Sequence, residues 1–283
     1  MIIDFHTHTF PDKIAHRVVQ QLGQISHTKP FTDGTAANLI SSMAEAGINW
    51  SVNLPVMTTP VQVEKINSKM IDAQEEHHTK GIFSFGGIHP DYEPYKEELY
   101  RLKHYGIKGI KLHPAYQHMD LDDLHLMHII DAASELGLIT MLHAGMDIGI
   151  LDHNYSSVKH ILKLIDTLHP EKLVLAHMGN WDCWDDVENY LTGAPVWFDT
   201  AFSIGPITGY PGDSVIPYRT HNMDEEHFLR IARKHGIDKI LFATDSPWQD
   251  QKDYVELIQS FDLSFEELDK ILYKNADNLL HIL

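Results

Sequence analysis

Short apolar runs alternate along the chain with longer segments in which apolar residues recur every three or four positions. The runs are rich in aliphatic, β-branched and aromatic side chains, and they cover residues 2–8, 50–56, 82–89, 107–113, 138–143, 173–177, 196–201 and 240–245. Near-continuous apolarity over so short a length is typical of a strand that is buried on both faces, as in a parallel sheet. The pattern therefore predicts eight buried strands.

The segments between these runs have the apolar spacing of helices. They cover residues 35–46, 60–76, 93–104, 124–136, 157–168, 185–191, 225–235, 253–261 and 265–280. Several ends carry helix signals. Gly47 suits a C-terminal cap, Pro60 suits a first helical turn, and Ser264 with Glu267 three residues later forms a capping-box pattern. Strands and helices therefore alternate through the chain.

Eight strands that alternate with helices match the (β/α)₈ barrel, or TIM barrel, which typically takes about 250 residues. The alternative is a doubly wound open sheet, whose usual mark is a glycine-rich phosphate-binding turn after the first strand. The first run instead ends in His-Thr-His-Thr-Phe-Pro. No low-complexity linker, charge block or internal repeat divides the sequence, so we expect one α/β domain over residues 1–283.

Composition narrows the range of partners. Acidic residues outnumber basic ones by 40 to 22, and the formal net charge is -18 at pH 7. This argues against nucleic acid or an anionic membrane as the main partner, since both bind dense Lys and Arg surfaces. No apolar run approaches the roughly 20 residues of a membrane span. The N-terminus enters a strand-like run at once, which leaves no room for a signal peptide, so a cytoplasmic protein is expected.

Histidine is abundant, at 21 of 283 residues, and many of these histidines lie on helix-like stretches that suit a solvated surface. Five polar residues instead stand at the ends of predicted strands: His6, His8, His143, His177 and Asp245. His6 and His8 are two positions apart, so both can point to one face of a strand. Because the carboxyl ends of barrel strands open onto one mouth, we expect all five side chains at its rim.

These residue types indicate a transition-metal site at the C-terminal mouth of the barrel. Imidazole and carboxylate suit zinc, manganese, iron or cobalt, and incomplete protein coordination leaves room for water or substrate. A structural zinc site is usually closed and cysteine-rich, which the single cysteine, Cys183, rules out. We therefore expect a divalent metal with a catalytic role. Zinc is favoured over manganese, iron or cobalt, and one ion or two are both open.

The ordered motifs resemble the metal-dependent amidohydrolase superfamily, in the branch called amidohydrolase family 2. The resemblance rests on DFHTH in the first run, on GIHP and GIKLHP, on the two single histidines at strand ends and on TDSP, and it covers nearly the whole chain. It implies a distorted barrel with a divalent metal at its mouth. Carried over residue by residue, it implies His6, His8, His143 and Asp245 as metal ligands. His177 matches a histidine that polarises substrate or binds a second metal.

Lys111 lies in the fourth run, where binuclear relatives carry a carbamylated lysine that bridges two ions. The residue can be such a bridge, a partner of a substrate anion, or structural, and these alternatives stay open. His89 and His113 each precede a proline at a strand end. Either can line the pocket, or it can hydrogen-bond to loop backbone.

A metal-activated water would make the protein a hydrolase of an amide, lactone or ester bond of a small molecule. Asp245 would take the proton from this water, and His177 would polarise the carbonyl group. The alternative is nonoxidative decarboxylation of a small carboxylic acid, aromatic acids included, which members of the same branch perform with much the same ligands. A third reading, an inactive metal-binding scaffold, is opposed by the complete set of predicted ligands.

Substrate contacts are predicted from position alone. Arg219 lies in the long irregular segment 202–223 and can bind a substrate carboxylate with a forked hydrogen bond. Tyr116, Trp181 and Trp248 follow the fourth, sixth and eighth runs and can wall the mouth against a planar substrate. We therefore expect a small-molecule substrate. Barrels of this type often self-associate, but the sequence identifies no patch for a homo-oligomer.

Overall fold

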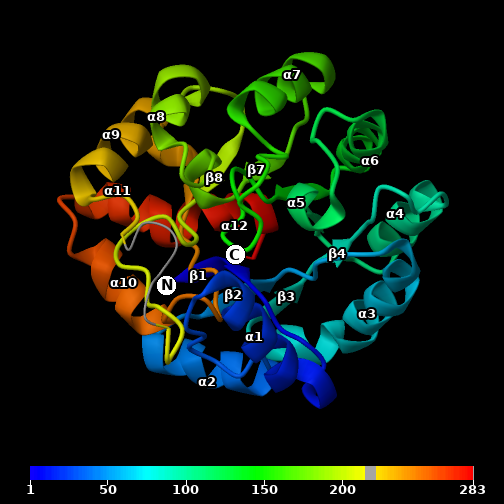
Figure 1. Ribbon diagram of the computed structural model, residues 1–283, viewed down its shortest axis with the longest axis horizontal. Helices are drawn as coiled ribbons and strands as arrows, with labels where there is room; N and C mark the ends of the chain where they lie inside the picture. The colour runs from blue at the N-terminus through cyan, green and yellow to red at the C-terminus, as the bar shows by residue number, and fades with distance from the viewer. Residues whose placement is uncertain (214–220, 283) are drawn as a thin grey trace. The chain divides into compact units, whose positions relative to one another are not determined.

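The computed structural model describes residues 1–213 and 221–282 and shows an α/β protein with parallel strands (Figure 1). The chain forms two compact units, each of which is described by itself. One unit contains Met1–Asn53 and Asp199–Leu283, so it joins the two ends of the sequence. The other is the continuous segment Leu54–Phe198. Arg219, the predicted carboxylate ligand, lies outside the described residues.

The terminal unit is built on strand β1 (Ile3–Thr7), which pairs in parallel with β2 (Trp50–Asn53). The chain around β9 (Ile240–Leu241) runs along β1 as well. The Phe5 amide donates to the Phe242 carbonyl at 2.9 Å, and the Asp245 amide donates to the His6 carbonyl at 2.9 Å. These bonds hold the chain beyond β9 beside β1 as far as Asp245, the last residue of the eighth apolar run.

Helices of the terminal unit pack beside these strands. They are α1 (Asp12–Ser26), α2 (Ala36–Ala46), α9 (Glu225–His235), α10 (Gln251–Gln259), α11 (Phe265–Asp269) and α12 (Asn275–Leu280), with the π-helical turn η5 (Lys270–Lys274) and the 3₁₀ turn η4 (Ile237–Lys239). Helices α2 and α10 come from opposite ends of the chain and lie side by side (Figure 1). Helix α1 is not predicted by the sequence analysis. Its first residue follows Pro11, which provides no side-chain cap.

Cap chemistry explains where several of these helices begin and end. Gly47 has a left-handed φ of 70° after α2, a conformation that glycine adopts without steric cost. Ser264 and Glu267 form the predicted capping box at the start of α11. The predicted helix 265–280 continues through the π-helical turn η5, which divides it into α11 and α12.

The continuous unit contains a parallel sheet in sequential strand order. The strands of this sheet in the unit are β4 (Gly86–Gly87), β5 (Gly109–Leu112), β6 (Ile139–Leu142), β7 (Leu173–Leu175) and β8 (Trp197–Asp199), whose last residue is counted with the terminal unit. Strand β3 (Ile82–Ser84) precedes them in the chain and is not part of this sheet. Strands β4 to β8 pair neighbour with neighbour, all in parallel. The predicted run 82–89 is divided at Phe85 into β3 and β4.

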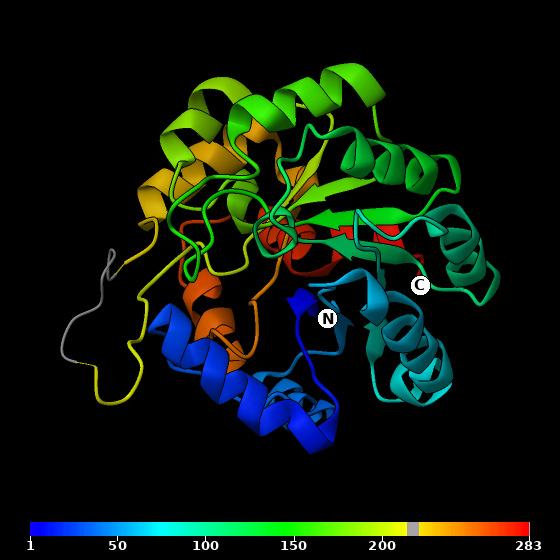
Figure 2. The ribbon, with the colours of Figure 1, turned by 45° about the vertical axis from the view of Figure 1, so that its right-hand side comes forward.

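Helices of the continuous unit follow the strands in alternation. They are the 3₁₀ turn η1 (Pro60–Gln62), α3 (Val63–Thr79), α4 (Tyr95–His104), α5 (Pro114–Gln117), α6 (Leu124–Glu135), α7 (Val158–Leu168), the 3₁₀ turn η2 (His177–Gly179), α8 (Trp184–Asp186) and the π-helical turn η3 (Val187–Leu191). Helix α6 packs against β6 and against α4, and Figure 2 shows α6 and α7 along the outer side of the strands. Helix α5 is a short element that the sequence analysis does not predict.

Each predicted apolar run contains an observed strand, and the five polar residues singled out in the sequence lie near or beyond the carboxyl end of a strand. His113 comes directly after β5, His143 comes directly after β6, and His177 lies two residues after β7. Because parallel strands point their carboxyl ends to one edge of a sheet, these three histidines share that edge. The expectation of one domain over the whole chain stays a prediction. Within the described part of the chain, no helix combines the length and apolarity that a membrane span needs.

Candidate metal centre

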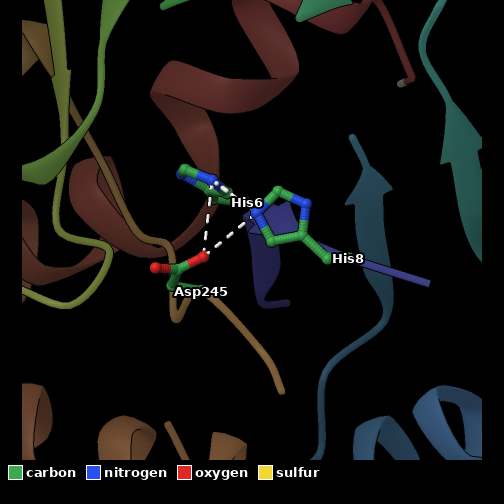
Figure 3. Close-up of side chains that lie close together, drawn as sticks. All are labelled: His6, His8 and Asp245. Atoms are coloured by element: carbon green, nitrogen blue, oxygen red, sulfur yellow. Dashed lines mark hydrogen bonds and ion pairs between the residues drawn. The ribbon is translucent and has the colours of Figure 1, made fainter. Parts of the chain in front are cut away.

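His6, His8 and Asp245 meet in the terminal unit (Figure 3). The Nε2 atoms of His6 and His8 are 3.1 Å apart, and the Asp245 Oδ1 lies 3.5 Å from His6 Nε2 and 3.1 Å from His8 Nε2. Two ligand atoms that each lie about 2.1 Å from one ion are about 3.0 to 3.4 Å apart. The three side chains therefore have the spacing of ligands to one ion.

The backbone at Asp245 is held in an unusual conformation. Its φ of 66° lies in the left-handed region, which costs energy for a residue with a Cβ atom. Hydrogen bonds maintain it, since the Asp245 amide donates to the His6 carbonyl and the Trp248 amide donates to the Asp245 carbonyl at 2.8 Å. The carboxylate is thereby aimed at the two histidines of β1.

A second cluster in the continuous unit contains His113, His143, Asp147 and His177. The Asp147 Oδ2 lies 3.6 Å from His113 Nε2 and 3.8 Å from His143 Nε2. The rings of His113 and His143 are stacked with centroids 4.0 Å apart, and His143 Nδ1 lies 3.1 Å from His177 Nε2. His113, His143 and Asp147 can hold a metal ion through one atom each.

His143 is a buried member of this cluster, and its surroundings disfavour the charged imidazole. Burial, and then the charges of His113, His177 and Lys111, hold the pKa of His143 well below its usual value. The imidazole is therefore neutral at pH 7. Its Nε2 atom is buried and has no hydrogen-bond partner among the described residues. A neutral imidazole with such an orphaned nitrogen is suited to bind a metal or a polar group of a ligand.

His113 is less well prepared for a metal. It caps helix α5, where its Nδ1 accepts the Tyr116 amide hydrogen at 3.3 Å. This bond favours the tautomer that carries its proton on Nε2, the atom that faces Asp147. His113 and Asp147 therefore form a carboxylate–imidazole pair, and ligation through His113 Nε2 requires the other tautomer.

The two clusters fit a metal to different degrees. In the terminal unit, two imidazole nitrogens and a carboxylate oxygen converge, which suits zinc, manganese or iron and leaves coordination positions for water or substrate. The His6 ring is also held on its far side, because its Nδ1 lies 2.8 Å from the buried carboxylate of Asp199. We therefore take His6, His8 and Asp245 as the candidate metal centre.

The structure places the other predicted site residues in defined surroundings. Lys111 is buried in β5 and pairs with Met141 of β6. His89 is buried, which lowers its pKa, and its Nδ1 accepts the Asp91 amide hydrogen at 3.2 Å. Their roles in binding substrate stay predictions.

The aromatic residues proposed as walls differ in burial. Tyr116 is partly exposed, and its ring centroid lies 4.4 Å from that of His113. Trp181 is buried and its backbone pairs with Gly145, whose φ of 100° and close approach to Trp181 leave no room for a Cβ atom. Trp248 is partly exposed, three residues after Asp245. Contact of any of them with a substrate stays a prediction.

Two residues with a place in these clusters are missing from the sequence-based set. Asp199 ends β8, and Asp147 follows His143 by four residues. Asp199 is the charged residue inside the seventh apolar run, 196–201, so its position was a usable signal. Asp147 lies in an irregular loop after β6, where apolar spacing gives no information about direction.

The alternating parallel strands define an α/β protein of the TIM-barrel type, with candidate metal-binding side chains. The sequence matches the amidohydrolase family model over residues 3–282. The chain therefore belongs to the amidohydrolase family, as its motifs indicate. A comparison with curated protein sequences gives no match.

Solved structures with the same fold include enzymes with bound metal. A TIM-barrel protein of uncharacterized function from Bordetella bronchiseptica is 17% identical, with a TM-score of 0.77 over 99% of this chain and 98% of that one. A 5-carboxyvanillate decarboxylase from Novosphingobium aromaticivorans, solved with manganese and 3-methoxy-4-hydroxy-5-nitrobenzoic acid, is 15% identical, with a TM-score of 0.70 over 100% and 97% of the two chains. A dihydroxybenzoic acid decarboxylase from Polaromonas, solved with manganese and 2-nitroresorcinol, is 13% identical, with a TM-score of 0.67 over 99% and 96%.

These likenesses confirm the predicted barrel fold. They do not support the preference for zinc, because the two decarboxylase structures hold manganese. The four-ligand set implied by the resemblance contains His6, His8 and Asp245 of the terminal unit and His143 of the continuous unit. That full set stays a prediction.

Proposed function

We propose that the protein is a metal-dependent nonoxidative decarboxylase of a small hydroxylated aromatic acid. The observation that carries the proposal is the incomplete ligand set of His6, His8 and Asp245, whose ligand atoms converge without closing the coordination sphere. Manganese is our first candidate for the ion, with zinc as the alternative. His143 remains the proposed fourth ligand, and His177 the proposed substrate-polarising residue.

The relatives favour this reaction over hydrolysis. Two proteins of the same fold are named decarboxylases of hydroxylated benzoic acids, and both were solved with manganese and a nitrated phenol or phenolic acid. A bound cation would also attract an anionic substrate, which the net charge of -18 otherwise repels. We therefore prefer decarboxylation, which the sequence analysis gave as the alternative, to hydrolysis, which it favoured.

The reaction replaces a carbon–carboxylate bond with a carbon–hydrogen bond. A proton adds to the ring carbon that carries the carboxylate, the carbon–carbon bond then breaks, and its electron pair returns to the ring as carbon dioxide leaves. A bound divalent metal supplies positive charge that fixes the acid and its neighbouring hydroxyl group. Asp245, whose Oδ1 lies between the two histidines, is the proposed proton carrier. His6 and His8 hold the geometry of the centre.

Hydrolysis of an amide, lactone or ester remains the second candidate, because the same ligands can activate water. The reactions differ in what they consume. Decarboxylation takes one proton from solvent and releases carbon dioxide, whereas hydrolysis places one water oxygen in the products.

The deciding experiment uses full-length protein loaded with Mn²⁺ and a panel of mono- and dihydroxybenzoic acids, with esters, lactones and amides in parallel. In D₂O, decarboxylation is expected to release carbon dioxide and to leave one deuterium at the carbon that lost the carboxylate. In H₂¹⁸O, that product gains no label. Incorporation of ¹⁸O into cleaved esters, lactones or amides, with no carbon dioxide from any acid, would establish the hydrolase instead.

A further inference from the structure

Asp199 contacts the candidate metal centre at His6, on the side of the ring away from His8 and Asp245. Its Oδ2 is 2.8 Å from His6 Nδ1, and the side chains are 0% and 1% exposed. The other carboxylate oxygen, Oδ1, accepts the Ala201 amide hydrogen at 3.1 Å. Each carboxylate oxygen of Asp199 therefore accepts a hydrogen bond, and neither oxygen belongs to the His6–His8–Asp245 ligand set.

The hydrogen bond decides which nitrogen of His6 carries the proton. A carboxylate only accepts, so His6 Nδ1 must carry the hydrogen that fills the 2.8 Å gap. In the neutral ring the lone pair then lies on Nε2, the nitrogen that faces His8 and Asp245. Metal-bound histidines in general donate their second ring N–H to an outer partner, which fixes the tautomer and the ring orientation.

We propose that Asp199 is a positioning residue that holds His6 in the Nδ1–H tautomer and so prepares Nε2 to bind the metal. The inference rests on the proposed role of His6 as a ligand. Asp199 does not touch the ion or the substrate in this scheme. It acts through His6 alone.

The support around Asp199 is rigid, as a positioning role requires. Thr200, the next residue, donates its hydroxyl hydrogen to the Ala243 carbonyl at 2.8 Å and accepts the Ala243 amide hydrogen at 2.9 Å. The Tyr254 hydroxyl donates to the Thr200 carbonyl and accepts the Ser203 amide hydrogen at 3.0 Å. These bonds fix the turn after β8, and with it the direction of the Asp199 carboxylate.

Two substitutions of Asp199 separate this role from a merely structural one. Asp199→Asn keeps an oxygen for the Ala201 amide, so its NH₂ group takes the place of Oδ2 and donates to His6 Nδ1. The His6 proton is then forced onto Nε2, where it blocks metal binding. Asp199→Ala removes the hydrogen bond but imposes no tautomer. A structural role predicts that the isosteric asparagine is the milder change, whereas the tautomer role predicts that it is the more harmful one for the metal.

The measurement is the affinity of metal-free full-length protein for Mn²⁺, followed by the loss of the paramagnetic resonance signal of free Mn²⁺. We expect Asp199→Asn to weaken binding by about 100-fold and Asp199→Ala by about 10-fold. For thermal stability we expect the opposite order, with Asp199→Asn more stable than Asp199→Ala. In a His6→Gln background, Asp199→Asn should have no further effect on Mn²⁺ affinity, because the residue that it acts through is gone.

Asp213→Asn is the matched control. The Asp213 Oδ2 lies 2.7 Å from His27 Nδ1 in the same unit, outside the metal centre, so the same chemical change should leave Mn²⁺ affinity unaltered. Unchanged affinity in Asp199→Asn, or a larger loss in Asp199→Ala than in Asp199→Asn, would overturn the proposal. Wild-type protein that binds no Mn²⁺ would overturn the metal centre and this role together. Normal Mn²⁺ binding without carbon dioxide release would remove only the proposed reaction.

Discussion

Three side chains carry the candidate metal centre, and each reaches it by a different local device. His6 and His8 share a strand face because they are two residues apart, and His6 is additionally gripped by Asp199. Asp245 instead depends on a left-handed backbone conformation at its own position. Asp245 is therefore the proposed ligand whose backbone placement costs the most energy. A substitution that tolerates the same backbone conformation tests the chemistry of the carboxylate without a change of fold.

Asp245→Asn is expected to lower turnover by at least about 100-fold, because the amide can neither carry the proton nor supply an anionic ligand. Asparagine tolerates the left-handed region and keeps the backbone hydrogen bonds, so the far-ultraviolet circular dichroism spectrum should be unchanged. The test is turnover on the best substrate of the decarboxylation panel at saturating Mn²⁺. Turnover near the wild-type value would exclude Asp245 from the reaction.

The sequence reveals residues at strand ends but not the partners that orient them. His6, His8 and Asp245 were found because each interrupts or closes an apolar run. Asp199 interrupts a run too, yet only the fold shows that its carboxylate faces His6 Nδ1 across 193 positions of sequence. Asp147 was missed for another reason, since the direction of a loop side chain depends on the tertiary contacts of that loop.

Among the elements, β1 and the chain beyond β9 are joined by a buried carboxylate. Asp4 accepts hydrogen bonds from the Thr244 hydroxyl at 2.6 Å, the Thr244 amide at 3.0 Å, the Gln251 side chain at 2.7 Å and the His6 amide at 3.2 Å. Burial raises the pKa of Asp4 to about 6, although these bonds oppose the shift. Strand β1, the chain beyond β9 and the start of α10 thus share one acceptor group.

Asp4→Asn is expected to lower the free energy of unfolding by about 2 to 4 kcal/mol. All four groups that hydrogen-bond to Asp4 are donors, and the asparagine NH₂ group would face one of them with another donor. Urea unfolding at pH 7 measures the effect. Asp253→Asn is the control, because Asp253 is exposed and lies on α10, the helix whose Gln251 donates to Asp4. It should alter the free energy of unfolding by less than about 0.5 kcal/mol. An Asp4→Asn protein as stable as wild type would contradict the joining role of this carboxylate.

Helix α11 carries a second pH-sensitive contact at its first turn. A hydrogen bond from Arg233, followed by the Ser264 amide, lowers the pKa of Glu267 to about 2. Because the folded-state pKa is lower than the usual 4.5, the stabilisation is present above about pH 5 and is lost as the pH falls towards 2.

Glu267→Gln should therefore cost about 1 kcal/mol at pH 7, the modest value of a solvent-screened ion pair. The difference from wild type should shrink steadily between pH 5 and pH 3. Urea unfolding across this range provides the measurement. A difference that stays constant with pH would show that the glutamate charge contributes nothing, and that only its capping hydrogen bonds matter.

The element pattern was more predictable than the element boundaries. The alternation of strands and helices could be predicted because apolar periodicity reports burial, and all eight runs contain a strand. Helix α1 lacks a side-chain cap at its start. The division of the run 82–89 at Phe85 is marked in the sequence only by the two glycines that follow. Such features depend on packing against the rest of the unit.

For the whole molecule, the central expectation is that metal binding and stability are linked. An ion that binds only the folded state adds about 2.7 kcal/mol at a free concentration 100 times its dissociation constant. Removal of metal with a chelator should therefore lower the melting temperature, and added Mn²⁺ should raise it in a concentration-dependent way.

The His6→Gln variant supplies the comparison for this linkage. It should lose the Mn²⁺-dependent rise in melting temperature, while metal-free variant and metal-free wild type should melt close together. An equal Mn²⁺-dependent rise in both proteins would place the stabilising ion elsewhere, with the cluster of His113, His143 and Asp147 as the next site to test.

The order of the proposed ligands along the chain has a consequence for biosynthesis. His6 and His8 are synthesised before the continuous segment Leu54–Phe198, whereas Asp199 and Asp245 are synthesised after it. That segment can begin to fold during translation, but Met1–Asn53 must wait for Asp199–Leu283, with which it forms the terminal unit. A nascent chain that has not yet reached Asp199 therefore displays two histidines without their carboxylate partners, and we expect metal affinity to appear only once Asp245 has been added.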